Sequence, residues 1–252
     1  MSLRSELGKA RQRLLCTVHF RPMALANQGP VVSFCFDDFP RTAYAVGGAI
    51  LTTFGARGTY YAAPGLMNTQ NELGDQFTQE DLDSLLADGH ELGCHTFSHV
   101  SCRGLPLRTF EHDVQKGRNA IREMTGRDPV NFAYPFGHVT VAAKQRIGIY
   151  MGSCRGIYAG VNGPTADLNL LRANSLYGDI DRLREIESLF AENTQRQGWL
   201  IFYTHDVRRE PSRFGCTPAL LESTASYAVK QGYRIVPVEQ VIAGAQSTLP
   251  AD

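Results

Sequence analysis

Short apolar runs alternate with segments of helical periodicity along most of this chain. The predicted strands cover residues 31–36, 58–62, 130–133, 199–203 and 233–237. The predicted helices cover residues 42–54, 79–88, 107–125, 141–147, 179–196 and 218–231. Strands separated by helices pair in parallel, because each helix carries the chain back to the same edge of the sheet. The alternation therefore predicts one α/β domain, a parallel barrel of about seven strand–helix units.

The size and charge of the chain narrow the classes of protein to which it can belong. A chain of 252 residues is long enough to bury one full core, and many single barrels have this size. Lysine plus arginine and aspartate plus glutamate balance at 25 each, so the sequence predicts no nucleic-acid partner and no anionic membrane surface. There is also no run of about 18 apolar residues that could span a bilayer.

Two further features predict a cytoplasmic location. Residues 1–10 are charged, and the apolar run over residues 14–20 is interrupted by Thr17 and His19, so no signal peptide is expected. The six cysteines have no short regular spacing, and a chain of this length does not depend on disulfide bonds for its stability. We therefore expect all six cysteine thiols to be reduced.

Within the single domain, we expect an N-terminal helical extension over residues 1–27 and the barrel itself over residues 28–245. Residues 5–15 carry an apolar stripe among lysines and arginines, which predicts an amphipathic helix. Residues 31–36 are nearly all apolar, which is typical of a strand that is buried on both faces. Functional groups of α/β barrels lie at the carboxyl ends of such strands, so the residues after position 36 are the first to consider.

Two short segments supply two carboxylates and two imidazoles. Asp37 and Asp38 follow the first predicted barrel strand, and His95 and His99 lie four residues apart. One carboxylate can bind a divalent ion while its neighbour takes a proton from a water molecule whose pKa the ion lowers. On a helical turn, two histidines at this spacing point to the same side and can bind the same ion. The two segments together predict a metal-dependent hydrolase.

Longer stretches around these residues resemble the motifs of one enzyme family. Four segments carry the resemblance: FDD at residues 36–38, LADGHELGCHTFSH at 86–99, GRDPVNFAYPFG at 126–137 and LIFYTHD at 200–206. In this order they are similar to the motifs of the polysaccharide deacetylase family, carbohydrate esterase family 4, named after rhizobial chitooligosaccharide deacetylases. The resemblance runs from about residue 31 to about residue 241 and implies a distorted parallel barrel of about seven strands with an incomplete wall.

The resemblance also implies a metal site and an activity. Asp38, His95 and His99 match the family's metal ligands, and Asp37 matches its general base. The implied cofactor is one divalent ion, with zinc expected first and cobalt, manganese or nickel as alternatives. The implied reaction removes N-acetyl groups from an amino-sugar-containing glycan or glycan precursor, so the expected partner is an N-acetylated carbohydrate.

Two more positions match residues that act on the substrate in the family. The backbone N–H of Phe136 matches the donor that stabilises the oxyanion of the tetrahedral intermediate. His205 matches the general acid that protonates the departing sugar amine.

The chain departs from the family pattern at three places. The family commonly has glycine after the aspartate pair, whereas this chain has Phe39 and Pro40, which predicts a stiffer loop and a narrower pocket entrance. The third motif commonly has an arginine that pairs with the base, whereas this chain has Ala133; we expect Arg172, in a later apolar segment, to replace it. No Asp-x-x-Asp-Trp motif is present to hold the acid histidine, which therefore needs another partner.

Four other interpretations stay open at this point. The same groups could hydrolyse another C–N bond, as in a small cyclic amide, imide or ureide, and acetate release from N-acetylated glycans would separate the two. The chain could be a non-catalytic carbohydrate-binding relative. Two histidines and one carboxylate also form the iron site of non-haem oxygenases, which oxygen consumption would reveal. Finally, Cys94, His95, His99 and Cys102 could form a closed structural zinc site.

Overall fold

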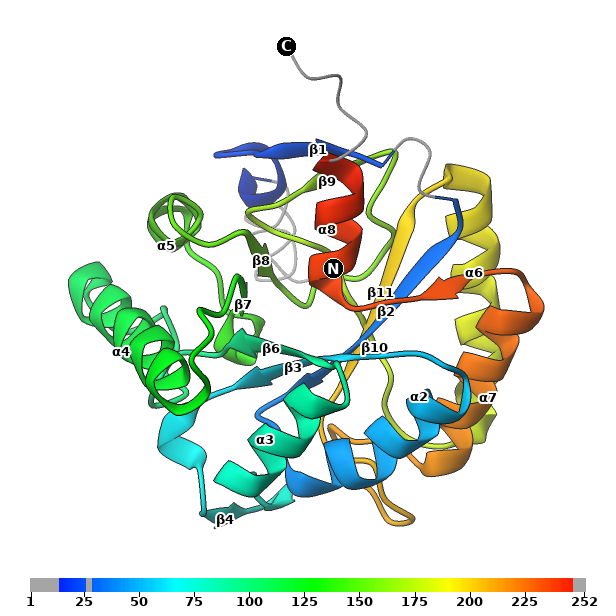
Figure 1. Cartoon of the computed structure of the whole chain (residues 1–252). Helices are drawn as coiled ribbons and strands as arrows, with labels where there is room; N and C mark the ends of the chain where they lie inside the picture. The colour runs from blue at the N-terminus through cyan, green and yellow to red at the C-terminus, as the bar shows by residue number, and fades with distance from the viewer. Residues whose placement is uncertain (1–13, 26–28, 247–252) are drawn as a thin grey trace, which may run out of the picture.

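A curled sheet of parallel strands forms the centre of the molecule, and helices surround it (Figure 1). The computed structural model describes residues 14–25 and 29–246. Seven strands follow one another in the order β10-β11-β2-β3-β6-β7-β8. Their bounds, in chain order, are β2 Val31–Asp37, β3 Thr59–Ala62, β6 Glu91–Cys94, β7 Asn131–Ala133, β8 Ser153–Arg155, β10 Asn174–Ser175 and β11 Trp199–Thr204.

The sheet is a barrel with an incomplete wall, as the family resemblance implied. Every neighbouring pair along the seven-strand path is parallel. Between the two ends of the path there is a single parallel bridge, from Arg155 to Leu171, in place of a ladder. β12 (Arg234–Ile235) pairs with the first residues of β2, while β3 pairs with its last three. The predicted fold class is therefore confirmed.

The helices and connecting strands complete the fold. The longer helices are α3 (Gln79–Ala87), α4 (Leu107–Thr125), α6 (Leu183–Arg196), α7 (Pro218–Lys230) and α8 (Val238–Gln246). The shorter ones are a π-helix η1 (Ala43–Gly48) continuing into α2 (Ala49–Thr53), α5 (Val141–Ile147), and the 3-10 turns η2 (Pro64–Leu66), η3 (Pro135–Gly137) and η4 (Ile180–Arg182). Two antiparallel pairs lie outside the main sheet: β1 (Pro22–Ala24) with β9 (Thr165–Asp167), and β4 (Gln70–Asn71) with β5 (Gly74–Asp75).

Successive side chains of β2 point alternately into two hydrophobic clusters, and this alternation decides which way the site residue at its end points. Val32, Phe34 and Phe36 belong to the cluster between the sheet and the outer helices. Val31 and Cys35 belong to a second cluster, which also contains alternate residues of β11 (Trp199, Ile201 and Tyr203) and the apolar side chains of α8. Successive side chains of a strand point to opposite faces. The last residue of the strand, at position 37, therefore faces the barrel interior together with the odd-numbered residues.

Three strands of the main sheet were not predicted, and their length and composition explain why. β6, β8 and β10 have only two to four residues each, too few to show alternation. β6 also contains Gly93, which is a weak strand former. The structure requires this glycine, because a Cβ at position 93 would lie 2.5 Å from the ring of Tyr61 on the adjacent strand β3. The short strands, and the glycine that close packing requires in β6, explain why these three strands could not be predicted from apolar alternation.

The N-terminal segment is attached to the barrel. Residues 14–17 are helical, and β1 pairs with β9 with Met23 opposite Ala166. The buried Lys144 amino group donates to the carbonyl of Leu15 and pairs with Asp167, each at 2.6 Å. The described part of the predicted extension (residues 1–27) is thus only partly helical. Most of the amphipathic helix predicted over residues 5–15, and the boundary near residue 27, lie outside the described residues.

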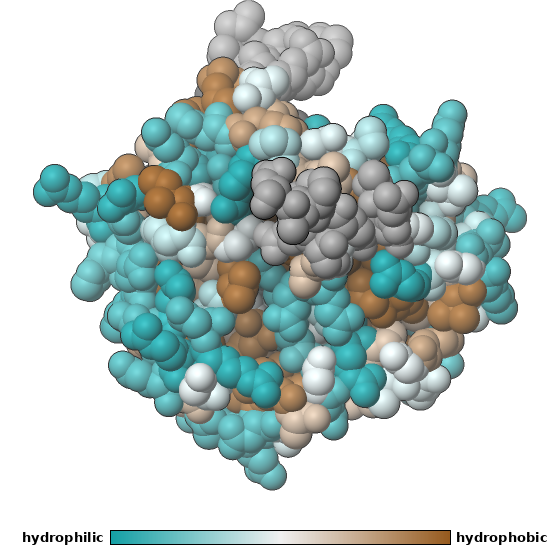
Figure 2. Space-filling model, turned by 45° about the horizontal axis from the view of Figure 1, so that its top comes forward, coloured by the Kyte–Doolittle hydropathy of each residue, from teal (hydrophilic) through white to brown (hydrophobic). Residues whose placement is uncertain are grey.

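The outer surface is largely polar. Hydrophilic side chains cover most of the face shown in Figure 2, and the hydrophobic ones form separate patches. This pattern is expected when apolar side chains are packed between the sheet and its helices. No helix within residues 14–25 and 29–246 is both long and apolar enough to cross a membrane.

Candidate metal centre and active site

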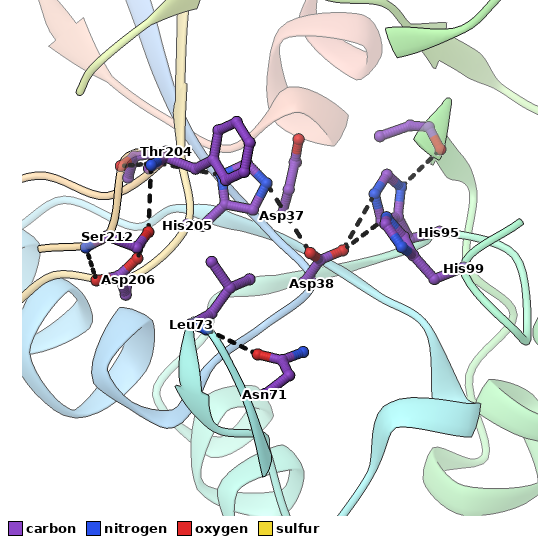
Figure 3. Close-up of polar contacts among 12 residues, drawn as sticks. Asp37, Asp38, Asn71, Leu73, His95, His99, Thr204, His205, Asp206 and Ser212 are labelled. Atoms are coloured by element: carbon purple, nitrogen blue, oxygen red, sulfur yellow. Dashed lines mark hydrogen bonds and ion pairs between the residues drawn. The ribbon is translucent and has the colours of Figure 1, made fainter. Parts of the chain in front are cut away.

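The predicted site residues meet at the carboxyl ends of the barrel strands (Figure 3). Asp37 ends β2 and Asp38 follows it, His95 directly follows β6, and His205 directly follows β11. Together they line a pocket of about 390 Å³. The other lining residues are Asn71, Glu72, Leu73, His99, Phe136, Gly137, Ile157, Tyr177, Tyr203 and Phe214.

Asp38, His95 and His99 form a compact group of possible metal ligands. Their ligand atoms all lie within 4.8 Å of one another. The Asp38 Oδ1 atom is 3.0 Å from His99 Nε2 and 3.5 Å from His95 Nε2. This Oδ1 is buried and has no hydrogen-bond partner among the described residues. An unsatisfied buried carboxylate oxygen facing two imidazole nitrogens fits a divalent cation with nitrogen and oxygen ligands.

The protonation of the two imidazoles also suits metal binding. His95 Nδ1 is 2.8 Å from the carbonyl oxygen of Ala133 and must donate to it, which leaves the Nε2 lone pair facing Asp38. Burial lowers the pKa of His95 to about 3, although Asp37 opposes the shift. Burial also lowers the pKa of His99. Neutral imidazole is the form that binds a metal ion, so both rings are held in the binding form at neutral pH.

Asp38 is a poorly stabilised anion in the protein alone. Burial raises its pKa to about 6; the His205 ring acts in the opposite direction, and the nearby Asp37 carboxylate adds to the increase. A cation beside Asp38 would favour its ionised form and reverse this shift. The electrostatics of Asp38 therefore agree with the geometry of the three ligands.

The ligand-bearing loops are held in strained backbone conformations. Eight non-glycine residues in the described ranges have positive φ angles, and five of them are at this site: Asp38 (63°), Phe39 (61°), Thr96 (65°), His99 (52°) and Phe136 (58°). Such a conformation costs roughly 1–2 kcal/mol per residue, and in other proteins it is concentrated at functional sites.

His95 and His99 do not lie on a helical turn, so that part of the prediction is wrong. They lie in the loop after β6, where left-handed conformations at Thr96 and His99 bring the two rings to a centroid distance of 5.0 Å. Asp113 of α4 holds this loop, since its Oδ1 accepts hydrogen bonds of 2.9 Å from the N–H groups of Phe97 and Ser98. The loop is thus shaped by its contacts with α4.

Arg155 pairs with Asp37 inside the barrel. The guanidinium of Arg155 donates to Asp37 Oδ1, and both side chains are buried. The guanidinium also lies over the rings of Tyr61 (5.0 Å) and Tyr203 (5.1 Å). Burial alone would raise the pKa of Asp37, but Arg155, His95 and His205 outweigh it and the pKa is lowered. Asp37 is therefore an anion at neutral pH and can accept a proton.

The prediction that Arg172 would support Asp37 is wrong. The Arg172 guanidinium donates to the carbonyl of Ala159 (3.0 Å) and approaches Cys16 Sγ (3.6 Å). Arg172 precedes the two-residue strand β10, so it lies at the end of that strand opposite to the pocket. Arg155, in contrast, is the last residue of β8 and reaches the pocket end of the sheet. A run of only three strand residues gave no sequence signal for this position.

Phe136 lies at the rim of the pocket. Its backbone is left-handed within the turn η3, and its side chain is 56% exposed and packs on His99 at a centroid distance of 4.5 Å. Its N–H makes no hydrogen bond to the described residues. The expected use of this N–H as an oxyanion donor stays a prediction.

His205 is held by a backbone carbonyl. Its Nδ1 is 3.2 Å from the carbonyl oxygen of Phe214, and its Nε2 is 3.9 Å from Asp38 Oδ2. The rings of Tyr177 and Phe214 contact the His205 ring, with centroid distances of 6.1 and 5.5 Å, and also contact each other at 6.0 Å. The loop that carries Phe214 thus supplies the partner that the missing fourth motif would provide. The acid role of His205 stays a prediction.

One other expectation about the loops is wrong, and one of the open alternatives is excluded. Phe39 does not narrow the entrance, because its ring is fully buried and stacks on Phe77 at 5.0 Å, away from the pocket lining. A closed zinc site with two cysteines is also excluded, since Cys94 Sγ contacts the carbonyl of Val114 and Cys102 Sγ that of His138. Neither cysteine belongs to the metal-ligand group found in the described residues.

Comparison with known proteins identifies the family. Residues 25–149 match the family model described as polysaccharide deacetylase. The chain belongs to the polysaccharide deacetylase family. A search of curated proteins gives no significant match.

Solved structures share the fold of this deacetylase family member at low sequence identity. The Xyl-CE4 domain of a multidomain xylanase from the hindgut metagenome of Trinervitermes trinervoides has a TM-score of 0.59 and 15% identity, covering 88% of this chain and 93% of that one. A family 4 acetyl xylan esterase from Clostridium thermocellum in complex with a cobalt ion has a TM-score of 0.57 and 19% identity, covering 84% and 90%. The peptidoglycan deacetylase PdaC from Bacillus subtilis has a TM-score of 0.54 and 16% identity, covering 87% and 92%.

Proposed function

We propose that this protein is a metal-dependent hydrolase that removes N-acetyl groups from an amino-sugar-containing glycan or glycan precursor. One observation carries the proposal: the Asp37 carboxylate, paired with Arg155, lies in the same pocket as the compact group of Asp38, His95 and His99. A base beside a three-ligand metal site is the arrangement that hydrolysis of an unreactive amide requires.

Asp38, His95 and His99 would hold the cofactor. Two imidazoles and one carboxylate match zinc first, and cobalt, manganese or nickel are the alternatives. When bound there, a divalent ion polarises the acetyl carbonyl and lowers the pKa of water. Membership of this family and the cobalt ion in one structural neighbour support a metal requirement.

Asp37 would act as the general base. Its lowered pKa keeps it ionised at neutral pH, so it can accept a proton from the attacking water. Arg155 holds one carboxylate oxygen and fixes the direction of the other. The two tyrosine rings that flank Arg155 keep bulk water away from the pair, which strengthens this electrostatic control.

His205 and Phe136 would complete the reaction. With Nδ1–H donating to the Phe214 carbonyl, the His205 Nε2 atom faces the pocket and can pass a proton to the departing amine. The N–H of Phe136 would donate to the oxyanion, an interaction worth roughly 3 kcal/mol in other hydrolases. Hydrolysis of an amide needs an acid such as His205, because a neutral amine leaves far more readily than an amide anion.

An acetylated carbohydrate is the substrate class that the comparisons support. Two of the structural neighbours are a peptidoglycan deacetylase and an acetyl xylan esterase. We favour the N-acetyl group because the chain supplies His205 as an acid for a basic leaving group. We also propose a cytoplasmic location, which is supported by the six cysteines, all described and all free of disulfide bonds.

A substrate screen tests this function. Purified zinc-loaded protein is incubated with N-acetylglucosamine oligosaccharides and, in parallel, with acetylated xylan, and acetate release is measured with the mass of the remaining glycan. We expect loss of acetyl groups from the N-acetylated series, and a decrease of 10²- to 10⁴-fold (about that range) for Asp37→Asn. Absence of acetate release from every N-acetylated glycan would refute the proposed substrate class.

A further inference from the structure

A small hairpin forms one wall of the pocket and brings a polar side chain to it. The hairpin consists of β4 and β5, with Asn71 opposite Gly74 in its register. Asn71, Glu72 and Leu73 all line the pocket that contains the metal-ligand group. In Figure 3, Asn71 and Leu73 lie on a different side of Asp38 from His95 and His99. A substrate bound at the metal site would therefore meet the hairpin on its way in.

The hairpin is held at both of its ends. Phe77, just after the hairpin, donates its N–H to the carbonyl of Phe39 at 3.2 Å, which links the hairpin to the loop that carries Asp38. On the opposite side, Arg208 donates to the backbone carbonyl of Glu72 at 3.3 Å. A polar group on a fixed hairpin can select a substrate, because little conformational entropy is lost when the substrate binds.

The direction of the Asn71 amide is set by the hairpin itself. Its Oδ1 accepts hydrogen bonds from the N–H of Leu73 (2.8 Å) and from Gln76 Nε2 (3.1 Å). A backbone N–H can only donate, so the atom that faces Leu73 must be the oxygen. The Nδ2 group then points away from Leu73 and makes no hydrogen bond to the described residues. It is an oriented donor on an exposed residue, with no partner among the described residues, and it is therefore open to a ligand.

Apart from Glu72, whose exposed carboxylate lies 3.9 Å from the Arg213 guanidinium, the other polar side chains of the pocket are already engaged. Asp37 is paired with Arg155, and the hydroxyl groups of Tyr177 and Tyr203 are hydrogen-bonded to each other. The remaining walls are mostly apolar or aromatic, including Phe136 and Phe214. Asn71 is therefore the neutral side chain best placed to recognise an oxygen atom of a polyhydroxylated ligand.

We propose that Asn71 is a substrate-positioning residue whose Nδ2 donates a hydrogen bond to a hydroxyl or ether oxygen of the sugar that carries the acetyl group. This inference rests on the proposed deacetylase function and makes it more specific. The contact would distinguish acetylated sugars from acetyl compounds that lack a hydroxylated ring. Because the contact exists before and during the reaction, it would act mainly on KM.

Two substitutions at this position separate substrate binding from a structural role. Asn71→Asp keeps an oxygen that accepts from Leu73 and Gln76 but removes the Nδ2 donor. Asn71→Ala removes both functions. Gln70→Ala is the matched control, because Gln70 belongs to the same hairpin and donates to Asp75 on the exposed side, outside the pocket lining.

The experiment measures kcat and KM of each zinc-loaded variant for N-acetylglucosamine oligosaccharides and for 4-nitrophenyl acetate, which has no sugar ring. For Asn71→Ala and Asn71→Asp we expect kcat/KM on the oligosaccharides to fall about 5- to 10-fold, mainly through KM, as for the loss of one hydrogen bond. For Asn71→Ala the rate on 4-nitrophenyl acetate should be retained. Gln70→Ala should retain both activities.

Three results would overturn the inference, and they can be told apart. Full oligosaccharide activity in Asn71→Asp would show that Asn71 only supports the hairpin. An equal fall of both activities in Asn71→Ala would show a general disturbance of the site. If the wild-type protein hydrolyses 4-nitrophenyl acetate but no N-acetylated oligosaccharide, the proposed substrate class fails, and the assignment of Asn71 to sugar recognition fails with it.

Discussion

Arg155 is the register partner of Ala133 on the adjacent parallel strand of the barrel. Side chains that are paired across two parallel strands point to the same face of the sheet. An arginine at position 155, on β8, therefore points toward the pocket as an arginine at position 133, on the neighbouring strand β7, would. The ion pair between Arg155 and Asp37 supplies the charge that Ala133 cannot provide.

Replacing Arg155 should impair catalysis more than metal binding. We expect Arg155→Met to lower kcat about 10- to 100-fold, the usual range for a residue that orients an active-site group. Zinc content should stay near that of the wild type, because Arg155 forms its ion pair with Asp37 and not with Asp38, His95 or His99. Steady-state kinetics and metal analysis of the same samples measure both effects.

Two further variants control this experiment. Arg172→Met should change kcat by less than about twofold, since that arginine contacts Ala159 and Cys16 away from the site. Adding Ala133→Arg to Arg155→Ala should restore part of the lost activity, as the arginine would again face the pocket. Unchanged kcat in Arg155→Met would contradict the assigned role of the pair.

The same pair should affect stability in a pH-dependent way. The pKa of Asp37 is lowered in the folded protein, so the pair stabilises the fold above the ordinary pKa of a carboxyl group, and this contribution is lost as the pH falls through the lowered value. Near neutral pH, Arg155→Met should reduce the free energy of unfolding by about 3 kcal/mol, because it leaves a buried carboxylate unpaired. Urea titrations at several pH values should show this difference shrinking in acid.

Glu91 should show the opposite pH dependence. Burial raises its pKa to about 7, although Asn131, Thr59 and the N–H of Glu239 donate hydrogen bonds to it. The folded protein therefore holds a proton that the unfolded chain has lost, and stability decreases as the pH rises from about 4.5 to about 7.

Glu91→Gln should remove this dependence. Relative to the variant, the wild-type free energy of unfolding should fall by roughly 3 kcal/mol across that pH interval. The amide of Asn131 can rotate to accept from the new side chain, because its other partner, the Ser153 hydroxyl, can donate or accept. Parallel curves for the two proteins would show that Glu91 does not titrate in this interval.

Phe39 should be a net stabiliser in spite of its strained backbone. Glycine at this position would relieve roughly 1–2 kcal/mol of strain, but it would remove a fully buried ring that stacks on Phe77, at a cost of about 3–5 kcal/mol. We therefore expect Phe39→Gly to lower the free energy of unfolding by about 2 kcal/mol, as measured in urea. A more stable Phe39→Gly protein would show that strain outweighs packing in this loop.

The sequence predicted those parts of the site that depend on local spacing. The aspartate pair lies at the end of a strand whose seven residues, Asp37 included, are all buried, and the two histidines lie within a single loop, so short patterns were sufficient. Arg155 was missed because its strand has three residues with glycines on both sides, Gly152 and Gly156. Arg172 was chosen in its place because it lies in a longer apolar segment.

Contacts between residues that are distant in the sequence account for the other differences between the predictions and the structure. The hairpin that carries Asn71 is polar and has two residues per strand, so no periodicity marks it. The approach of the two histidine rings depends on Asp113, which is distant in sequence and binds the loop through backbone N–H groups. The general α/β architecture was predictable from the alternation of strands and helices. The partners of Asp37 and His205, which are Arg155 and the Phe214 carbonyl, depend instead on which strands and loops meet in the fold.

Metal content is the most direct test of the central claim that Asp38, His95 and His99 form a metal site. Wild-type protein and the double variant His95→Ala, His99→Ala are dialysed against zinc, and bound zinc per chain is measured by atomic emission, with circular dichroism as a check on folding. We expect one zinc ion per chain in the wild type and almost none in the folded double variant. Equal zinc content in both proteins would contradict the proposed site and the mechanism built on it.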